Sequence, residues 1–369
     1  MKILLFDNSA LIKKGDDFCV EMGTGKFAKE LQDLENDVKF FGQILPETDV
    51  SNDNFQLKEN GIGVKGIVRK NNKILSYLNL YIKAIPEIIT SDFVYFFYPT
   101  ALRFLIFIAI IFKKKYGIYI RGADDIENFE SKIFYKNAFV VLSVADFFTN
   151  YVNNITKRNV GKTIRPMINF NQKDINYKRE YNLKEPFKLL YLGRMANDKG
   201  IIELLYAVEY LNINNVKIIL KLVGNGEYIN ELKKLAAELK INTIVEFVGS
   251  VFDRQEIEKY YTESDLYILP TYHEGFPRTL YEAMIFGTPI ITTFVGGISG
   301  LMKDKFNCLE IEPKSIQSII NALQFALKNY QLMGKFAQNG RETVKHVLET
   351  RNLSHAQTLD NLLKTYLNK

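Results

Sequence analysis

Residues 266–300, LYILPTYHEGFPRTLYEAMIFGTPIITTFVGGISG, alternate strand and helix signals. The apolar run Leu266 to Leu269, which stops at Pro270, predicts a short buried strand. Pro277 suits the first turn of a helix, which we expect to continue to about Phe286 before Gly287 ends it. Residues 288–292 predict a second buried strand. The stretch therefore predicts a strand–helix–strand unit of an α/β fold.

Two carboxylates flank the predicted junction between strand and helix. Glu274 lies in the loop and Glu282 lies in the helix, with seven residues between them. The N–H groups near Thr279 and Leu280, at the start of the helix, favour binding of phosphate. Two carboxylates that can accept hydrogen bonds from sugar hydroxyls, next to a helix start that favours phosphate, predict a pocket for a nucleotide-sugar.

The preceding residues repeat the same alternation of strand and helix. Phe187 to Leu192 predict a strand, and the loop after it holds two cations, Arg194 and Lys199, in the string GRMANDKG. We expect Arg194 to bind a diphosphate with its bidentate fork and Lys199 to bind it as a point charge. The alternation predicts a parallel, doubly wound sheet with ligands at the carboxyl ends of its strands.

The string EGFPRTLYEAM, followed by GTP, resembles the signature of retaining GT-B glycosyltransferases of family 4, the glycosyl transferases group 1. The resemblance implies an α/β fold of two Rossmann-like doubly wound domains that face a cleft, with a C-terminal helix crossing back to the first domain. The motifs match over residues 187–300. The first domain matches in general pattern only.

The resemblance also implies roles for single residues. Arg194 and Lys199 would bind the donor diphosphate, Glu274 would orient the sugar, and Glu282 would hold ribose hydroxyls. The expected donor-binding residues are Gly193, Gly224, Gly249, Gly275, Phe276, Pro277, Thr279, Leu280 and Glu282. No metal or other cofactor is expected, because the sequence shows no Asp-x-Asp triplet and no His/Cys ligand set. Solvated surface charge is the alternative explanation for these charged side chains.

Length and pattern predict two domains in these 369 residues. We expect an N-terminal acceptor-binding domain over residues 1–168 and a linker over 169–186. A nucleotide-sugar-binding domain would follow over 187–350, and the terminal helix over 351–369.

The first domain offers weaker signals. Residues 3–6 predict a strand, and a glycine loop, Gly23, Thr24 and Gly25, is expected before a helix that starts at Lys26. In the resembled family a glycine-rich loop here borders the acceptor and the donor phosphates. Arg121 and Asp124 lie in a turn where family members often place a histidine, which this chain lacks there. A purely structural turn fits these residues equally well.

Charge and composition bear on partners and location. A count gives 27 Lys and Arg against 22 Asp and Glu in residues 1–185, and 21 against 20 in the remainder, within a net charge of +6. This excess is too mild for a nucleic-acid binder, but it suits contact with an anionic membrane or a phosphorylated acceptor. Two cysteines and the lack of a signal-peptide pattern predict a cytoplasmic protein, with peripheral contact at the inner face of the membrane left open. The apolar run 93–112 predicts a strand and a buried helix rather than a membrane span, and residues 113–115, three lysines, could touch lipid headgroups.

These observations predict a hexosyltransferase-type enzyme (EC 2.4). It would move a sugar from a UDP-sugar to a saccharide acceptor, and the resemblance implies that the configuration at the anomeric carbon is retained. The acceptor could be lipid-linked, as in capsule or surface-polysaccharide assembly, or soluble. A GT-B nucleotide-sugar 2-epimerase and a non-catalytic sugar-nucleotide-binding module are the alternatives.

Overall fold

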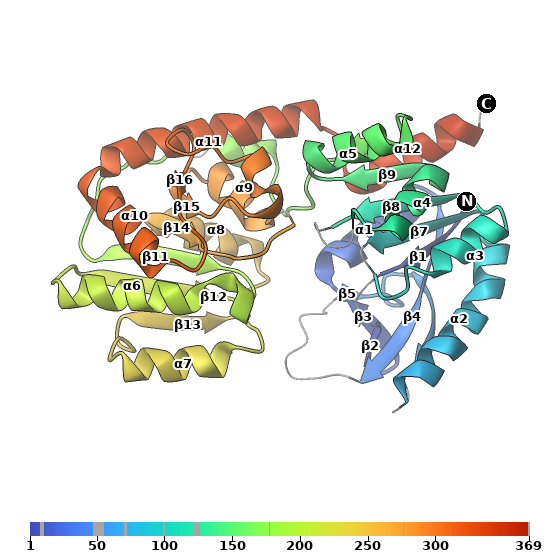
Figure 1. Ribbon diagram of the computed structural model, residues 1–369, viewed down its shortest axis with the longest axis horizontal. Helices are drawn as coiled ribbons and strands as arrows, with labels where there is room; N and C mark the ends of the chain where they lie inside the picture. The colour runs from blue at the N-terminus through green and yellow to red at the C-terminus, as the bar shows by residue number, and fades with distance from the viewer. Residues whose placement is uncertain are drawn as a thin grey trace. The chain divides into compact units, whose positions relative to one another are not determined.

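The structure is a computed structural model that describes residues 1–7, 11–46, 55–69, 72–98, 100–121, 126–176, 178–275 and 277–367. The chain divides into two compact units (Figure 1). Unit 1 comprises residues 1–167 and 353–369, and unit 2 comprises residues 168–352.

Unit 2 is built on a six-stranded sheet whose strands pair in parallel. Its order is β13–β12–β11–β14–β15–β16, so successive strands run outward from β11 to one edge and then from β14 to the other. The strands are β11 (Phe187–Leu192), β12 (Ile218–Val223), β13 (Val245–Gly249), β14 (Leu266–Leu269), β15 (Ile290–Thr292) and β16 (Leu309–Glu310). Strand order therefore reverses between β11 and β14, which is where open α/β sheets bind ligands.

Helices cover both faces of this sheet, as Figure 1 shows. They are α6 (Ile201–Ile213), α7 (Ile229–Glu238), α8 (Arg254–Glu263), α9 (Arg278–Ile285), α10 (Ile316–Lys328) and α11 (Tyr330–Thr350), with short 3₁₀ turns η1 (Gln172–Asn176), η2 (Asn197–Lys199) and η3 (Gly296–Gly300). Every residue of β14 and β15 is buried, as parallel strands packed on both faces require. The expected doubly wound sheet is confirmed. The helix predicted from Pro277 begins one residue later, because Pro277 is its N-cap.

Unit 1 contains a larger, mixed sheet of order β10–β9–β8–β7–β1–β4–β2–β3–β5, with β6 also paired to β4. Its strands are β1 (Lys2–Phe6), β2 (Leu11–Lys14), β3 (Asp17–Val20), β4 (Asp37–Pro46), β5 (Phe55–Gln56), β6 (Gly63–Val68), β7 (Phe93–Tyr98), β8 (Tyr116–Ile120), β9 (Val140–Ser143) and β10 (Gly161–Thr163). The central strands β4, β1, β7, β8, β9 and β10 are parallel. Strand order reverses between β1 and β7, so this unit is also doubly wound.

The helices of unit 1 correct several expectations. They are α1 (Met22–Asp33), α2 (Lys73–Thr90), α3 (Leu105–Ile111), α4 (Phe129–Asn137), α5 (Asp146–Thr156) and α12 (His355–Leu367). Helix α1 starts at Met22, so Gly23, Thr24 and Gly25 form its first turn rather than a loop before it. An unpredicted antiparallel pair, β2 with β3, precedes it. The apolar run after β7 enters α3 only at Leu105.

The C-terminal helix α12 belongs to unit 1, as the resemblance implied, and packs against α1. Asn36 Nδ2 donates to Asp360 Oδ1 at 2.9 Å, and Ser354 Oγ donates to Glu30 Oε1 at 2.7 Å. His355 is buried, and its Nε2 lies 2.6 Å from the Tyr95 hydroxyl. Burial lowers the pKa of His355 well below its usual value, with a smaller effect of the Arg121 charge in the same direction. Among the described residues, no helix is long and apolar enough to cross a membrane.

Candidate functional site

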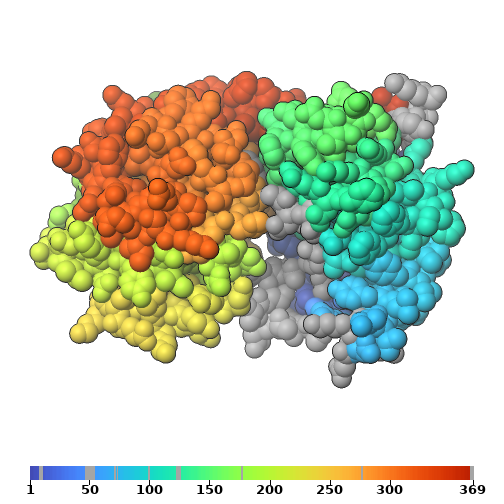
Figure 2. Space-filling view, in the orientation of Figure 1, coloured from blue at the N-terminus to red at the C-terminus, as the bar shows by residue number. Residues whose placement is uncertain are grey.

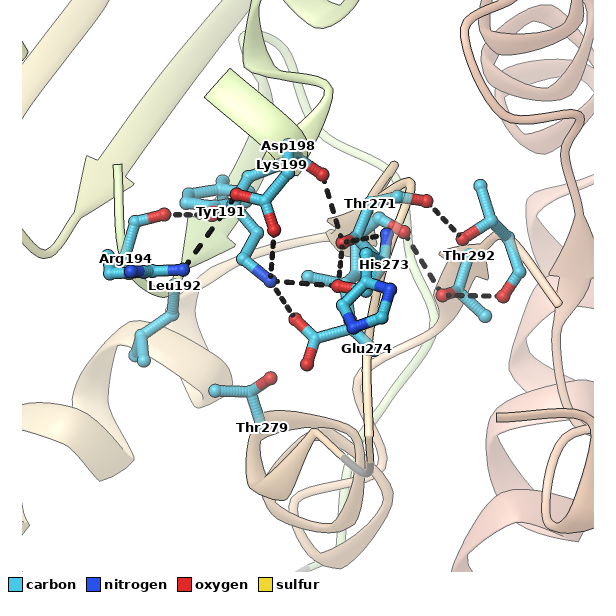
Figure 3. Close-up of polar contacts among 12 residues, drawn as sticks. Tyr191, Leu192, Arg194, Asp198, Lys199, Thr271, His273, Glu274, Thr279 and Thr292 are labelled. Atoms are coloured by element: carbon cyan, nitrogen blue, oxygen red, sulfur yellow. Dashed lines mark hydrogen bonds and ion pairs between the residues drawn. The ribbon is translucent and has the colours of Figure 1, made fainter. Parts of the chain in front are cut away.

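The loops after β11 and β14 meet at the point where the strand order of unit 2 reverses. The first loop carries Arg194, Asp198 and Lys199, and the second carries His273 and Glu274 (Figure 3). Lys199 and Glu274 are 75 positions apart in the sequence, yet Lys199 Nζ lies 2.7 Å from Glu274 Oε1. The fold therefore brings together two charged residues that we had assigned to one site from separate motifs.

Lys199 is held by several acceptors and is nearly buried. Its Nζ donates to the carbonyl oxygen of His273 at 3.0 Å and also lies 3.4 Å from Asp198 Oδ2. Only 10% of the Lys199 side chain and 19% of the Glu274 side chain are exposed. An ammonium group withdrawn from water to this degree needs such partners, because burying an unpaired charge is costly. The pair is a preorganised charge site at the carboxyl ends of β11 and β14.

Backbone contacts fix the two loops against each other. The N–H of Tyr272 donates to the carbonyl oxygen of Asp198 at 2.8 Å. Gly200, directly after Lys199, has φ +66°, and a Cβ there would lie 2.0 Å from the carbonyl oxygen of Pro270. Only glycine combines this left-handed conformation with so close an approach. The glycine after Lys199 is thus required to seat the first loop on the second.

Arg194 differs from Lys199 in its surroundings. Its side chain is 58% exposed, and its only charged partner among the described residues is Asp198, at 3.9 Å. A contact of that length at the surface contributes little. The guanidinium can therefore turn toward a ligand, whereas the Lys199 ammonium is already in place.

Glu282 lies on α9 but is far less accessible than we expected for a residue facing a pocket. It is 9% exposed and accepts a hydrogen bond from the Tyr261 hydroxyl at 3.1 Å. Burial raises the pKa of Glu282 to about 7, against the opposing effects of Arg278 and the Tyr261 hydrogen bond. Near neutral pH this carboxyl is therefore close to half protonated.

Three tyrosines that we had not assigned support the site from below. Tyr191 of β11 donates to the Arg194 carbonyl oxygen at 2.7 Å, and Tyr267 of β14 donates to Thr279 Oγ1 at 2.7 Å. Tyr261 of α8 holds Glu282. Burial raises the pKa of each hydroxyl, so all three stay protonated as donors. The sequence held a signal for two of them, because a tyrosine inside a buried strand needs a partner for its hydroxyl.

The remaining predicted donor residues lie at the same edge of the sheet. Gly193 follows β11, Gly224 follows β12, and Gly249 is the last residue of β13. The N–H of Gly224 donates to the Gly249 carbonyl oxygen at 2.7 Å. Thr279 and Leu280 form the first turn of α9. Within the described chain, the N–H of Leu280 donates to Pro277 at 3.2 Å, and no protein acceptor is seen for the N–H of Thr279. Gly275 accepts from the N–H of Gly297 at 3.0 Å, and Phe276 lies outside the described residues.

Unit 1 has a separate polar cluster at the carboxyl ends of β1 and β8. Arg121 donates to Asp7 Oδ1 at 2.8 Å and to Thr24 Oγ1, and its guanidinium lies 4.4 Å from the centre of the Phe97 ring. Glu21 caps α1 by accepting from the N–H of Thr24 at 3.0 Å. A carboxylate thus lies where we had expected a glycine loop that contacts phosphate. Asp124, our other candidate here, lies outside the described residues.

Metal ligands were not expected, and in the described parts of both units no group of three or more His, Cys, Asp or Glu side chains is arranged to hold a metal ion.

Known proteins resemble this chain at two levels. Residues 173–343 match the family described as Glycosyl transferases group 1. The chain is 28% identical over 179 residues, 46% of each protein, to the Escherichia coli UDP-Gal:alpha-D-GlcNAc-diphosphoundecaprenol alpha-1,3-galactosyltransferase. It is 33% identical over 134 residues, 36% of this chain and 31% of the relative, to the putative teichuronic acid biosynthesis glycosyltransferase TuaC of Bacillus subtilis. These matches span less than half the length of either relative.

Solved structures match over the whole chain. The crystal structure of Anabaena HepE in complex with UDP has a TM-score of 0.68 at 19% identity, covering 99% of this chain and all of that one. Sucrose-phosphate synthase from Thermosynechococcus elongatus has a TM-score of 0.70 at 18% identity, covering 100% and 99%. At these identities the likeness establishes the fold, two Rossmann-like α/β units of the GT-B type. The chain therefore has the GT-B fold, and its residues 173–343 match the glycosyl transferases group 1 family.

Proposed function

We propose that this protein is a glycosyltransferase that moves a sugar from a nucleoside-diphosphate sugar, with UDP as the nucleotide, to a saccharide acceptor with retention at the anomeric carbon. The ion pair of Lys199 with Glu274 carries the proposal, because it places a fixed cation and a hydroxyl acceptor at the ligand-binding edge of unit 2. The match of residues 173–343 to the glycosyl transferases group 1 family supports the same function. The UDP named with HepE supports the choice of nucleotide.

The chemistry asks the site to stabilise a departing nucleoside diphosphate. In this proposal the cations of Arg194 and Lys199 and the N–H of Thr279 meet the negative charge that develops there. Because Lys199 is already positioned, it costs no reorganisation when the bond breaks, which is where such groups are most effective. Arg194, which is exposed, would close on the diphosphate after the donor has bound.

The two carboxylates take different roles. Glu274 would accept hydrogen bonds from the sugar hydroxyls while its other contact holds Lys199. Glu282 would accept from the ribose hydroxyls once its carboxyl ionises. Neither role calls for a metal or a further cofactor. We therefore propose that the transfer reaction requires neither. We also propose that the acceptor is lipid-linked, which the name of the Escherichia coli relative, a diphosphoundecaprenol-directed enzyme, supports.

The experiment is turnover of a panel of UDP-, GDP- and ADP-sugars, read as nucleotide release. Lys199→Met should lower the rate by about 10²–10³ if the cation stabilises the leaving group. Lys217→Met is the matched control: this lysine of the same unit pairs with Glu185 at 2.8 Å but is 71% exposed and precedes β12, at the other end of the strands. NMR of the product linkage then tests retention. Equal rates for the two variants, or an inverted product, would contradict the proposal.

A further inference from the structure

Helix α2 of unit 1 has apolar residues on its outer side as well as on the side it buries. Its buried residues include Leu80, Ala84 and Ile88, which pack into the unit. Its other face exposes five large aliphatic side chains, which leave between 42% and 80% of their surface open. These residues, named here the α2 outer stripe, are Ile74, Leu75, Leu78, Ile82 and Ile89.

The spacing makes the stripe continuous. Leu75, Leu78, Ile82 and Ile89 follow one another at intervals of three, four and seven, which places them on one face of a helix. From Leu75 to Ile89 this face runs about 21 Å at the rise of an α-helix. Scattered exposed leucines need no explanation, but a continuous apolar face on a surface helix marks an interaction site.

Helix α3 extends the apolar surface alongside α2. Lys114 Nζ donates to the carbonyl oxygen of Ile89 at 2.8 Å and so joins the end of α3 to the end of α2. Phe104, Ile111 and Phe112 of this segment are also exposed. In Figures 1 and 2 the α2 and α3 segments form one outer edge of unit 1.

The charges around the stripe indicate what covers it. Residues 69–115 contain eight Lys and Arg against two Asp and Glu, a net charge of +6 that equals the net charge of the whole chain. Of the two acids, Glu87 is buried and paired with Lys39 at 2.7 Å, whereas Asp92 is exposed and accepts a hydrogen bond from the N–H of Lys2 at 2.7 Å. Lys83 on α2 and Lys113 beside Phe112 are exposed. The occupant must therefore offer both an apolar phase and negative charge.

A second copy of this chain fits these requirements poorly, because pairing the same face twice would bring like charges together. An anionic bilayer meets both. Aliphatic side chains enter the boundary of the acyl chains, while flanking lysines keep their ammonium groups at the headgroups. We propose that the α2 outer stripe, together with Lys83, Lys113 and the exposed end of α3, is a docking surface that lies on an anionic lipid bilayer. If the proposed transfer to a lipid-linked acceptor holds, this surface would keep unit 1 where that acceptor resides.

The test is binding of the full chain to vesicles of phosphatidylcholine alone and with about 30% phosphatidylglycerol. We expect co-sedimentation with the anionic vesicles only, weakening as salt rises from about 0.1 to 0.5 M. Leu78→Glu/Ile82→Glu should lower the partition coefficient by at least about tenfold, because it places two carboxylates in the apolar boundary. Ile213→Glu is the control, because Ile213 is 68% exposed at the end of α6 in unit 2. This variant should bind the anionic vesicles as the parent does.

Several outcomes would overturn the inference. They are no binding to either vesicle, equal losses in the two variants, or self-association of the parent that Leu78→Glu/Ile82→Glu abolishes, which would identify a second copy as the occupant. Thermal unfolding of both variants checks that they fold. Donor turnover without vesicles is measured on the same samples. Turnover without vesicle binding would reject the docking surface alone, and vesicle binding without turnover would reject the proposed function alone.

Discussion

The buried carboxyl of Glu282 allows one prediction to be worked out in magnitude. Burial raises its pKa from 4.5 to about 7, so between these pH values the folded protein binds more protons at this group than the unfolded chain does. Stability therefore falls as pH rises from about 4.5 to 7 and levels off above that range. The shift corresponds to about 3 kcal/mol.

The substitution Glu282→Gln removes this titration but keeps a hydrogen-bond acceptor for Tyr261. We expect the variant and the parent to unfold alike near pH 4.5 and to diverge up to pH 7, where the variant is more stable by about 3 kcal/mol. For a unit of this size that is a rise in Tm of about 6–12 °C. Thermal unfolding of both proteins between pH 4.5 and 8.5 measures it.

The control is a second Glu→Gln substitution whose effect on stability near neutral pH should have the opposite sign. Glu87 of unit 1 is also shielded from water, but its hydrogen bonds to Lys39 and Lys65 outweigh the effect of burial and lower its pKa. Glu87→Gln should therefore destabilise the protein near neutral pH, and the loss should shrink as the pH falls below the pKa of a free carboxyl. A stability difference between Glu282→Gln and the parent that does not change with pH would refute the assigned pKa and its cause.

The same carboxyl links stability to donor binding. Ribose hydroxyls donate to an ionised carboxylate, so donor binding should release a proton from Glu282 at pH values below about 7. Calorimetry in two buffers that differ in ionisation enthalpy would measure this release in the parent. The Glu282→Gln variant should bind the donor more weakly and release none. Equal proton release in both proteins would remove Glu282 from the proposed ribose contact.

Two further outcomes follow from other positions. Burial lowers the pKa of His355, so below about pH 6.5 the unfolded chain binds a proton at this group that the folded protein does not bind. The free energy of unfolding should therefore fall below that pH by up to about 1.4 kcal/mol per pH unit as the pH is lowered. Urea unfolding of His355→Phe should lack this dependence on pH. Gly296 has φ +58°, and a Cβ there would lie 1.7 Å from the Glu274 carbonyl oxygen, so Gly296→Ala should cost at least about 1–2 kcal/mol and abolish donor-induced stabilisation in a thermal-shift assay. Gly300→Ala, whose Cβ would meet nothing within 4 Å, should leave both unchanged.

Much of unit 2 could be predicted because its signals are local. Short apolar runs alternate with helical segments, and a run that is buried on both faces indicates a parallel strand whatever its neighbours are. The carboxyl ends of such strands meet at one edge of the sheet, so Lys199 and Glu274 could be assigned to one site from two separate motifs. Residues 11–20 were not predicted as strands. The pair β2 and β3 consists of strands of four residues each, one of which reads Leu-Ile-Lys-Lys, and its pairing depends on partners distant in the sequence.

The sequence by itself determined the order of strands and helices in unit 2, the two-unit α/β organisation and the loops that carry the candidate chemistry, because these depend on residue types over short windows. Only the tertiary structure decided the electrostatic state of the site. Whether a carboxylate at a given position is paired like Glu274, or buried and half protonated like Glu282, depends on how many atoms from other segments surround it. Desolvation and hydrogen bonding set that state, and both arise only when segments far apart in the chain are packed together.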